Sequence, residues 1–450
     1  MPSGGRLHIV LIPGFAGFDA LGQLEYYAGV TPVFRDWRRR RQEQAHVVLH
    51  YFDNFPTAAV NTRARRLQGY LAKRIARGEF EAGDALALVG HSTGGLDIRW
   101  LLWELGRDPD RTIPVDGGGG SAFTVRGKEI LNLVGRVVFL SVPQWGTNIA
   151  DWVHEHTITR ATVVAELRAV VEASQLPFLE KIESWLAAGA SSLTDLDFVR
   201  AVQDALSEAD ARTREPDPTS TADAHEAASQ LELWLRYIAS DFSAINDLSS
   251  RPPLGDLASP AHFSSEMRGE EMGLWERRQI RTRSYATLGS RPFGFEAGGT
   301  APLWILWEPW TYPDLTPAAD SSPETDITYR TCYRACAGGP FDHRSTTPTL
   351  KGLNRSGQHR IDQLTEGQGI ELWDNDGIVN TASMLWPDGE NTVLVAADHM
   401  DIVGHYELVE AIPGSGRRYQ AYDLLKSSSG FGRDSFEQVW NDLFDFCCSS

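Results

Sequence analysis

The five residues Gly90–Gly94, with the sequence Gly-His-Ser-Thr-Gly, are the part of the chain best suited to covalent chemistry. They fit the pattern G-x-S-x-G, in which two glycines permit a sharp backbone turn that exposes the middle serine. An apolar run, Ala85–Val89, precedes the motif, and a helical pattern, Leu96–Leu105, follows it. A chance serine in a glycine-rich turn is the alternative, but the position between a strand and a helix favours Ser92 as a nucleophile.

A serine becomes a strong nucleophile only when a histidine takes its proton and a carboxylate orients that histidine. Two late segments supply such residues: Asp376 lies within Asn375–Val379, and His399 follows shortly after the apolar run Thr392–Ala396. An ordinary Asp-Gly turn and a surface histidine are the alternatives for these two residues. The chain order serine, acid, histidine favours both as partners of Ser92.

Apolar runs that alternate with amphipathic helical patterns must position these residues. The expected strands are Leu7–Ile12, His46–Tyr51, Ala85–Val89, Val134–Val142, Arg281–Leu288 and Thr392–Ala396. The expected helices of the same body are Asn61–Ala76, Leu96–Leu105 and Ser435–Phe446. This alternation predicts an α/β fold, with a mostly parallel central sheet flanked by helices on both faces.

Two long segments interrupt the alternation. Within residues 151–277, helical patterns follow one another without a strand, at Thr159–Ser174, Phe178–Ala188, Asp195–Asp210 and Ala224–Leu248, with a polar surface segment at Arg212–Asp223. Residues 292–350 are irregular, rich in glycine and proline, and strongly aromatic. We therefore expect a body formed by residues 1–150, 278–291 and 351–450, a helical cap or lid at 151–277, and an irregular insertion at 292–350.

Several islands of sequence resemble the bacterial triacylglycerol lipases of the Pseudomonas and Burkholderia type. The islands are Ile12–Asp19, Gly90–Gly95, Ser141–Asn148, Asn375–Val379 and His399–Asp401. The resemblance implies the α/β-hydrolase fold, with a helical lid above the site. It also implies the activity of an esterase or lipase, in which a carboxylic ester is cleaved through an acyl-enzyme.

The same resemblance assigns roles to individual residues. Ser92 is the nucleophile, Asp376 the acid of the triad and His399 the base. The backbone N–H groups of Phe15 and Thr93 form the oxyanion hole. Two such donors typically lower the barrier by on the order of a few kcal/mol.

Other positions support or depart from the family pattern. Arg63 matches the arginine that braces the oxyanion loop in these lipases, whereas Pro13 replaces a histidine that usually precedes the loop glycine. The lipases hold a calcium ion near the catalytic histidine with an aspartate that matches Asp401, but the next ligand position here is His405. Because calcium prefers oxygen ligands, we predict no metal and no cofactor, and leave Asp401 and His405 to pair with each other.

Composition narrows the partners further. The formal net charge of -18 opposes binding to nucleic acid or to anionic membranes. No run approaches the ~18 apolar residues of a transmembrane helix. The arginine run Arg38–Arg41 is expected to be the solvated end of a helix rather than a binding patch. Because no secretory leader fits before Leu7–Ile12, we expect a cytoplasmic protein, with a signal-independent secretion route left open.

The four cysteines imply no disulfide framework. Two of them, Cys447 and Cys448, lie at the C-terminus. Cys332 and Cys336 are close in sequence, and structural thiols are favoured over a bridge or a metal clip with His343.

Taken together, the residues favour hydrolysis of a small-molecule or lipid ester. The same triad would also serve a thioesterase, an acyltransferase, a lactonase or a polyester depolymerase, and a catalytically silent binding protein is the alternative from another class. Substrate choice is expected to lie in the insertions. Apolar cap residues Leu231, Leu235 and Ile238 fit either the core of a rigid cap, which we favour, or a lid that transiently touches lipid surfaces.

Overall fold

The computed structural model describes residues 5–15, 17, 20–21, 24–41, 46–116, 122–155, 243–250, 259–292, 327–337, 349–406, 408–411, 418–421, 423–425 and 427–449. Most of the expected helical cap lies outside these residues, including Thr159–Ser174, Phe178–Ala188, Asp195–Asp210, Arg212–Asp223 and the three apolar residues Leu231, Leu235 and Ile238.

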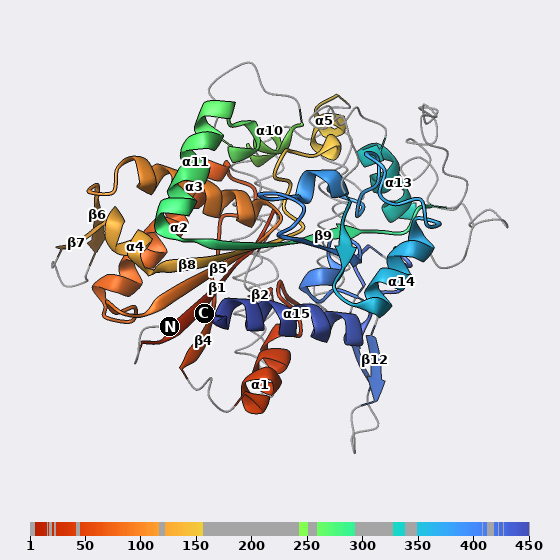
Figure 1. Ribbon diagram of the computed structural model, residues 1–450, viewed down its shortest axis with the longest axis horizontal. Helices are drawn as coiled ribbons and strands as arrows, with labels where there is room; N and C mark the ends of the chain where they lie inside the picture. The colour runs from red at the N-terminus through yellow and green to blue at the C-terminus, as the bar shows by residue number, and fades with distance from the viewer. Residues whose placement is uncertain are drawn as a thin grey trace, which may run out of the picture.

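Seven strands form one central sheet. They are β1 (Leu7–Ile12), β4 (Val47–Tyr51), β5 (Ala85–His91), β8 (Val134–Leu140), β9 (Arg281–Leu288), β10 (Lys351–Gly352) and β11 (Thr392–Ala396). Their order is β10-β11-β9-β8-β5-β1-β4, and every neighbouring pair is parallel (Figure 1). The six strands expected from the sequence all belong to this sheet, so the prediction of a parallel α/β body is confirmed.

Helices cover both faces of the sheet. Helices α2 (Val60–Ala76), α3 (Thr93–Arg107), α4 (Gly127–Leu133) and α11 (Ser265–Arg278) lie above it in Figure 1, and α1 (Val30–Arg40) and α15 (Arg433–Cys448) lie below. Strand β1 shows the physical cause, because successive side chains of a strand point to opposite faces. Leu7, Ile9 and Leu11 join the core between the sheet and helices α1 and α15. Val10 and Ile12 join the core between the sheet and helices α2 and α3. A strand buried on both faces is almost continuously apolar, and His8 is the one polar residue of β1.

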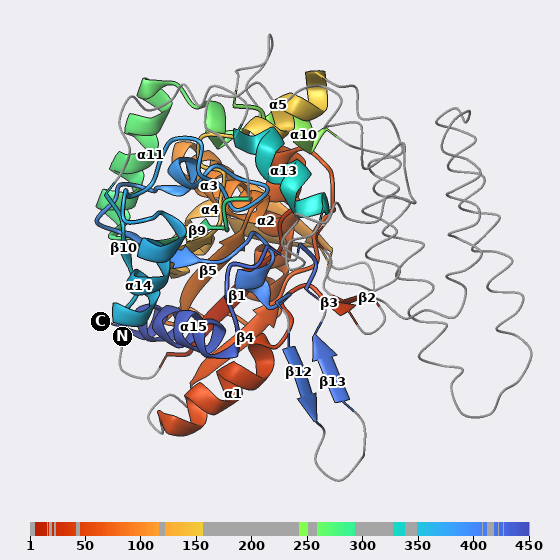
Figure 2. The ribbon, with the colours of Figure 1, turned by 90° about the vertical axis from the view of Figure 1, so that its right-hand side faces the viewer.

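The remaining elements surround this body. They are the helices α5 (Asn148–Glu155), α10 (Ala244–Leu248), α13 (Ile327–Ala337) and α14 (Arg355–Leu364), the short 3₁₀ helices Pro260–His262, Thr381–Met384 and Asp401–Val403, and the hairpins β2–β3 (Ala20–Leu21, Leu24–Glu25), β6–β7 (Thr112–Asp116, Ala122–Arg126) and β12–β13 (Leu408–Ala411, Arg418–Ala421). Figure 2 shows the β12–β13 hairpin projecting from the body. Sequence patterns did not predict α13, which lies inside the segment 292–350 expected to be irregular.

The first and the last helix of the described chain, α1 and α15, pack against each other. Phe34 lies edge-on to Phe444 with ring centroids 5.3 Å apart, and the Arg41 guanidinium lies 2.6 Å from the Asp445 carboxylate. The run Arg38–Arg41 is exposed at the end of α1, as expected. Arg40, which donates to Asn441 at 2.8 Å, and Arg41 therefore serve the contact between two helices.

The cysteines form no disulfide. All four are reduced thiols, and Cys336 is buried in α13, where its thiol donates to Asn380 Oδ1 at 3.3 Å. His343, the third member of the alternative metal clip, lies outside the described residues. In the part of the chain that the structure describes, no helix has the length and apolar character needed to cross a membrane.

Candidate active site

Ser92 occupies a strained turn between β5 and α3. Its backbone has φ 51° and ψ -130°, a region that residues with a side chain rarely adopt. A Cβ atom on Gly90 would lie 2.5 Å from the nitrogen of Gly95, and one on Gly94 would lie 2.5 Å from the carbonyl oxygen of Ile12. Only glycine fits at both positions, so the turn has the geometry of the elbow that the motif predicts. With the strand order, it completes the expected α/β-hydrolase fold.

The loop after β1 lies directly against Ser92. A Cβ atom on Gly14 would approach the Ser92 Cβ to 2.6 Å, so only glycine permits this contact. The Ser92 backbone N–H donates to the carbonyl of Leu140 at 2.9 Å, which fixes the elbow to the end of β8. The serine side chain thus lies at the carboxyl edge of the sheet, beside the loop expected to form the oxyanion hole.

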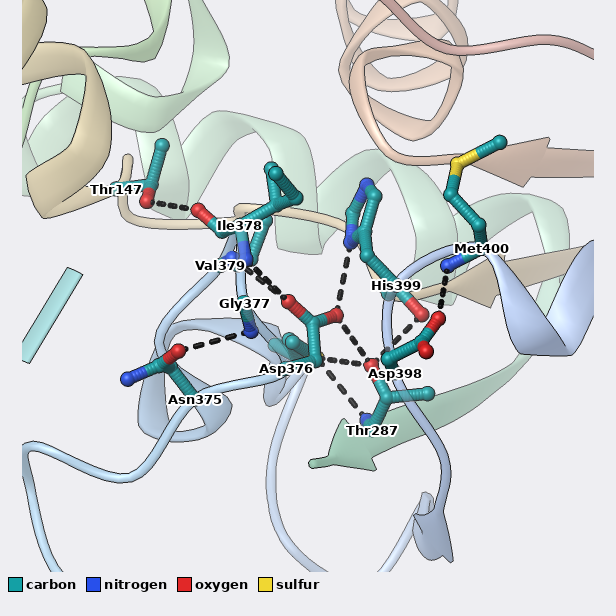
Figure 3. Close-up of polar contacts among 12 residues, drawn as sticks. Thr147, Thr287, Asn375, Asp376, Gly377, Ile378, Val379, Asp398, His399 and Met400 are labelled. Atoms are coloured by element: carbon teal, nitrogen blue, oxygen red, sulfur yellow. Dashed lines mark hydrogen bonds and ion pairs between the residues drawn. The ribbon is translucent and has the colours of Figure 1, made fainter. Parts of the chain in front are cut away.

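His399 and Asp376 meet at the same edge. His399 follows β11, and its Nδ1 lies 2.8 Å from Oδ2 of Asp376 (Figure 3). Asp376 is fully buried, and its Oδ1 accepts the backbone N–H groups of Ile378 at 3.0 Å and Val379 at 2.8 Å. These contacts set the orientation of the carboxylate, which in turn sets the orientation of the imidazole.

Thr287, at the end of β9, is a site residue that sequence reasoning missed. Its hydroxyl donates to Oδ2 of Asp376 at 2.6 Å. Because a hydroxyl has a single proton, the 2.8 Å contact between the Thr287 and Ser141 hydroxyls requires Ser141 to be the donor. A threonine at the carboxyl end of a predicted strand was the available signal, but its partner is 89 residues away in the chain.

The elbow that carries Ser92 lies beside His399, without a direct contact between their side chains. The rings of His399 and His91, the residue before Ser92, have centroids 4.7 Å apart. In the described part of the chain, no hydrogen bond joins the Ser92 hydroxyl to the His399 ring. Such contacts are often loose in the absence of substrate. In Figure 3 the second ring nitrogen of His399 points away from Asp376.

Arg63 reaches from α2 to the loop after β1. Its guanidinium donates from Nη2 to the carbonyl oxygens of Pro13 at 2.7 Å and Gly14 at 3.2 Å. Its Nε contacts both carboxylate oxygens of Asp97, at 3.1 and 3.0 Å, and both side chains are fully buried. Burial raises the pKa of Asp97, and the guanidinium opposes that rise. Phe15 follows directly on this loop, and Thr93 is the first residue of α3, where backbone N–H groups lack helical partners.

Three carboxylates cluster at the loop that carries His399. One oxygen each of Asp398, Asp401 and Asp423 lies within 4.8 Å of the others, and among the described residues this is the group able to hold a cation. Burial, and then the charge of Asp423, raise the pKa of Asp398 to about 7, and burial also raises that of Asp401. Asp401 accepts the Asp398 N–H at 2.8 Å and the Ser429 hydroxyl at 2.9 Å.

The expected pairing of Asp401 with His405 is wrong. The ring of His405 donates from Nε2 to the backbone carbonyl of Tyr26 at 3.1 Å. Burial lowers the pKa of His405 to about 4, so the ring is neutral and offers no charge to the carboxylate. Ser429, which is distant in sequence, supplies the side-chain donor to Asp401.

Comparisons with known proteins give distant likenesses. No family model matches the chain, and no curated protein matches it. Among solved structures, lipase 1 from Pelosinus fermentans is 16% identical with a TM-score of 0.41, over 99% of this chain and 100% of its own. The mature lipase BlEst2 from Bacillus licheniformis is 11% identical with a TM-score of 0.34, over 90% and 89% of the two chains. A metagenomic carboxyl esterase is 12% identical with a TM-score of 0.33, over 99% and 77%. At these values, the fold assignment rests on the strand order and the elbow described above.

Proposed function

We propose that this protein is a carboxylic ester hydrolase, an esterase or lipase, with Ser92, His399 and Asp376 as its catalytic triad. One observation carries the proposal. Ser92 lies in a strained elbow, and the ring of the preceding His91 lies beside that of His399, whose Nδ1 is bonded to a buried carboxylate at the carboxyl edge of a parallel sheet. That edge is where open α/β sheets place their ligand sites.

The reaction follows from the order of these contacts. Nε2 of His399 takes the proton of the Ser92 hydroxyl, and the serine oxygen attacks the ester carbonyl carbon. The imidazolium then gives its proton to the departing alcohol, which leaves an acyl-enzyme. Water, deprotonated by His399, cleaves the acyl-enzyme and regenerates Ser92. Asp376 fixes the tautomer with Nδ1 protonated and stabilises the imidazolium.

The developing oxyanion requires two fixed N–H donors, for which we propose Phe15 and Thr93. The contacts of Arg63 with the carbonyls of Pro13 and Gly14 support a role in holding the Phe15 segment. A buried arginine fork suits this task, because it bonds four backbone carbonyls in two loops and one carboxylate at once. Donors that are already oriented stabilise the tetrahedral intermediate without reorganisation during the reaction.

The substrate in this proposal is a small-molecule or lipid ester. The net charge of -18 disfavours a polyanionic substrate such as nucleic acid. Residues 151–277 are proposed to shape the acyl pocket as a cap, with transient contact to lipid surfaces as an additional role.

The decisive experiment replaces Ser92 with alanine. We expect Ser92→Ala to lose turnover of p-nitrophenyl esters and labelling by a fluorophosphonate, while the melting temperature stays close to that of the wild type. Substantial residual turnover in the variant would show that another residue carries the chemistry. A wild type that takes no label would instead indicate a binding protein with an unactivated serine.

A second measurement separates related activities on the same triad. Rates over p-nitrophenyl esters of increasing chain length should exceed rates over matched thioesters, lactones and polyester films. Faster release from a thioester would indicate a thioesterase, and product formation that depends on an added alcohol would indicate an acyltransferase.

A further inference from the structure

His91, at the first free position of the motif G-x-S-x-G, lies at the centre of a buried series of hydrogen bonds. Its Nδ1 is 2.6 Å from the Tyr26 hydroxyl, and its Nε2 is 2.9 Å from the backbone carbonyl of His399. The Tyr26 hydroxyl also accepts the backbone N–H of Gly14 at 2.9 Å. His91 is fully buried and Tyr26 is 3% exposed, so no bulk solvent competes for these contacts.

The protons of these hydrogen bonds have only one arrangement. The carbonyl of His399 can only accept, so Nε2 of His91 must carry a proton. Burial, with a smaller effect of the nearby His399, holds the pKa of His91 well below its ordinary value, and the ring is therefore neutral. Nδ1 then has no proton and must accept from Tyr26. All three hydrogen bonds therefore have the same donor-to-acceptor direction, from the Gly14 N–H through the Tyr26 hydroxyl and the His91 ring to the His399 carbonyl.

These hydrogen bonds connect two segments whose relative position must stay fixed during the reaction. Gly14 belongs to the loop that carries Phe15, and His399 is the base. A second contact connects Tyr26 to the same segment, because His405, six residues after His399, donates from its ring to the backbone carbonyl of Tyr26 at 3.1 Å. Tyr26 is thus bonded to the His399 segment through its side chain and through its backbone.

We propose that Tyr26 and His91 are positioning residues that lock the oxyanion loop to the loop of the catalytic base, across the nucleophile elbow between them. This inference rests on the proposed function. Neither residue touches the substrate in this arrangement. Both act through Gly14 and His399, whose spacing sets the distance between the oxyanion donors and the base.

The proposal predicts which kinetic constant changes. Without the Tyr26 hydroxyl, the Gly14 N–H loses its acceptor and His91 loses the donor that fixes its tautomer. Small displacements of catalytic groups slow the chemical step strongly, by up to ~100-fold for about 1 Å. Loss of interactions made only in the transition state lowers kcat and leaves KM unchanged. We therefore expect Tyr26→Phe and His91→Leu to lower kcat by ~10- to 100-fold, with little change in KM.

Three further measurements separate positioning from simple loss of stability. Tyr285→Phe is the matched control, because it removes a buried hydroxyl bonded to Asp442 at 2.6 Å in the core beneath the sheet. Its kcat should stay near that of the wild type at a similar loss in melting temperature. His91→Gln can still place an amide N–H near the carbonyl of His399, so it should recover part of the kcat lost in His91→Leu. The double variant Tyr26→Phe/His91→Leu should lose less kcat than the product of the two single losses, since members of one network are not additive.

The outcomes distinguish this inference from the proposed function. A wild type that neither hydrolyses esters nor takes the fluorophosphonate label defeats the proposed function, and this inference with it. An active wild type whose Tyr26→Phe variant retains the kcat of Tyr285→Phe defeats the inference alone. If His91→Leu does not fold, Tyr26→Phe still decides the question, because it removes a single oxygen atom.

Discussion

Two buried Asp–His pairs lie at opposite ends of the same sheet. At the carboxyl end, Asp376 contacts His399 at 2.8 Å; at the amino end, Asp84, just before β5, contacts His8 of β1 at 3.1 Å. The second nitrogen of His8 is taken by His50 of β4 at 2.9 Å. The second nitrogen of His399 makes no hydrogen bond within the described structure. An Asp–His pair can therefore act as a base only where its outer nitrogen is open towards a nucleophile.

The largest difference is expected between variants that disrupt one Asp–His pair each. Under the proposed function, we expect His399→Gln to lower kcat for ester hydrolysis by ~10⁴- to 10⁶-fold, as loss of a triad member does in serine hydrolases. His8→Gln should lower the melting temperature and leave kcat within about twofold, because it disturbs packing far from the ester site. Steady-state kinetics and thermal unfolding of the two variants test this contrast. Equal losses of kcat would refute the distinction between the two ends of the sheet.

A smaller effect is expected at the support of the carboxylate. Thr287→Val removes the hydroxyl that donates to Oδ2 of Asp376, and a hydrogen bond to a charged group contributes about 1.5–3 kcal/mol. We expect kcat to fall by about tenfold, equivalent to ~1.4 kcal/mol of barrier. Thr365→Val is the matched control, because its buried hydroxyl donates to the Ile361 carbonyl in α14. A Thr287→Val variant as active as this control would show that Asp376 needs no second side-chain partner besides His399.

The smallest expected effect is a difference in pH dependence of stability. Burial lowers the pKa of His50 from 6.5 to about 4, so the unfolded chain binds more protons and stability rises as pH increases through that window. The pKa of Asp398 is raised from 3.8 to about 7, so its contribution is present at low pH and is lost as pH rises towards 7. The two ends of the sheet should therefore respond to pH with opposite signs.

Urea unfolding between pH 4 and pH 7 measures both contributions. Relative to the wild type, the gain in unfolding free energy on raising the pH should be smaller in His50→Gln and larger in Asp398→Asn. A smaller gain in Asp398→Asn would contradict the raised pKa and would indicate that a cation keeps the carboxylates charged. Repeating the series with a chelator identifies that cation, because its removal would restore the expected sign.

The fold was predictable because buried parallel strands and amphipathic helices leave strong local patterns. Six of the seven strands of the sheet were expected, whereas β10, with two residues, is too short to produce a pattern. Helix α13 lies inside a segment rich in glycine and proline, where composition concealed its helical spacing. The order β10-β11-β9-β8-β5-β1-β4 depends on contacts between distant segments.

By itself, the sequence determined the elbow at Ser92, because only glycines permit the close approaches at Gly90 and Gly94. It also singled out Asp376 and His399, since local motifs and chain order are visible in one dimension. Only the tertiary structure decided what surrounds them: Thr287 on the acid, Tyr26 and His91 between two loops, and His405 on a backbone carbonyl rather than on Asp401. The physical reason is that a polar side chain in the interior bonds to whichever partner the fold brings near. That partner is set by packing and not by distance along the chain.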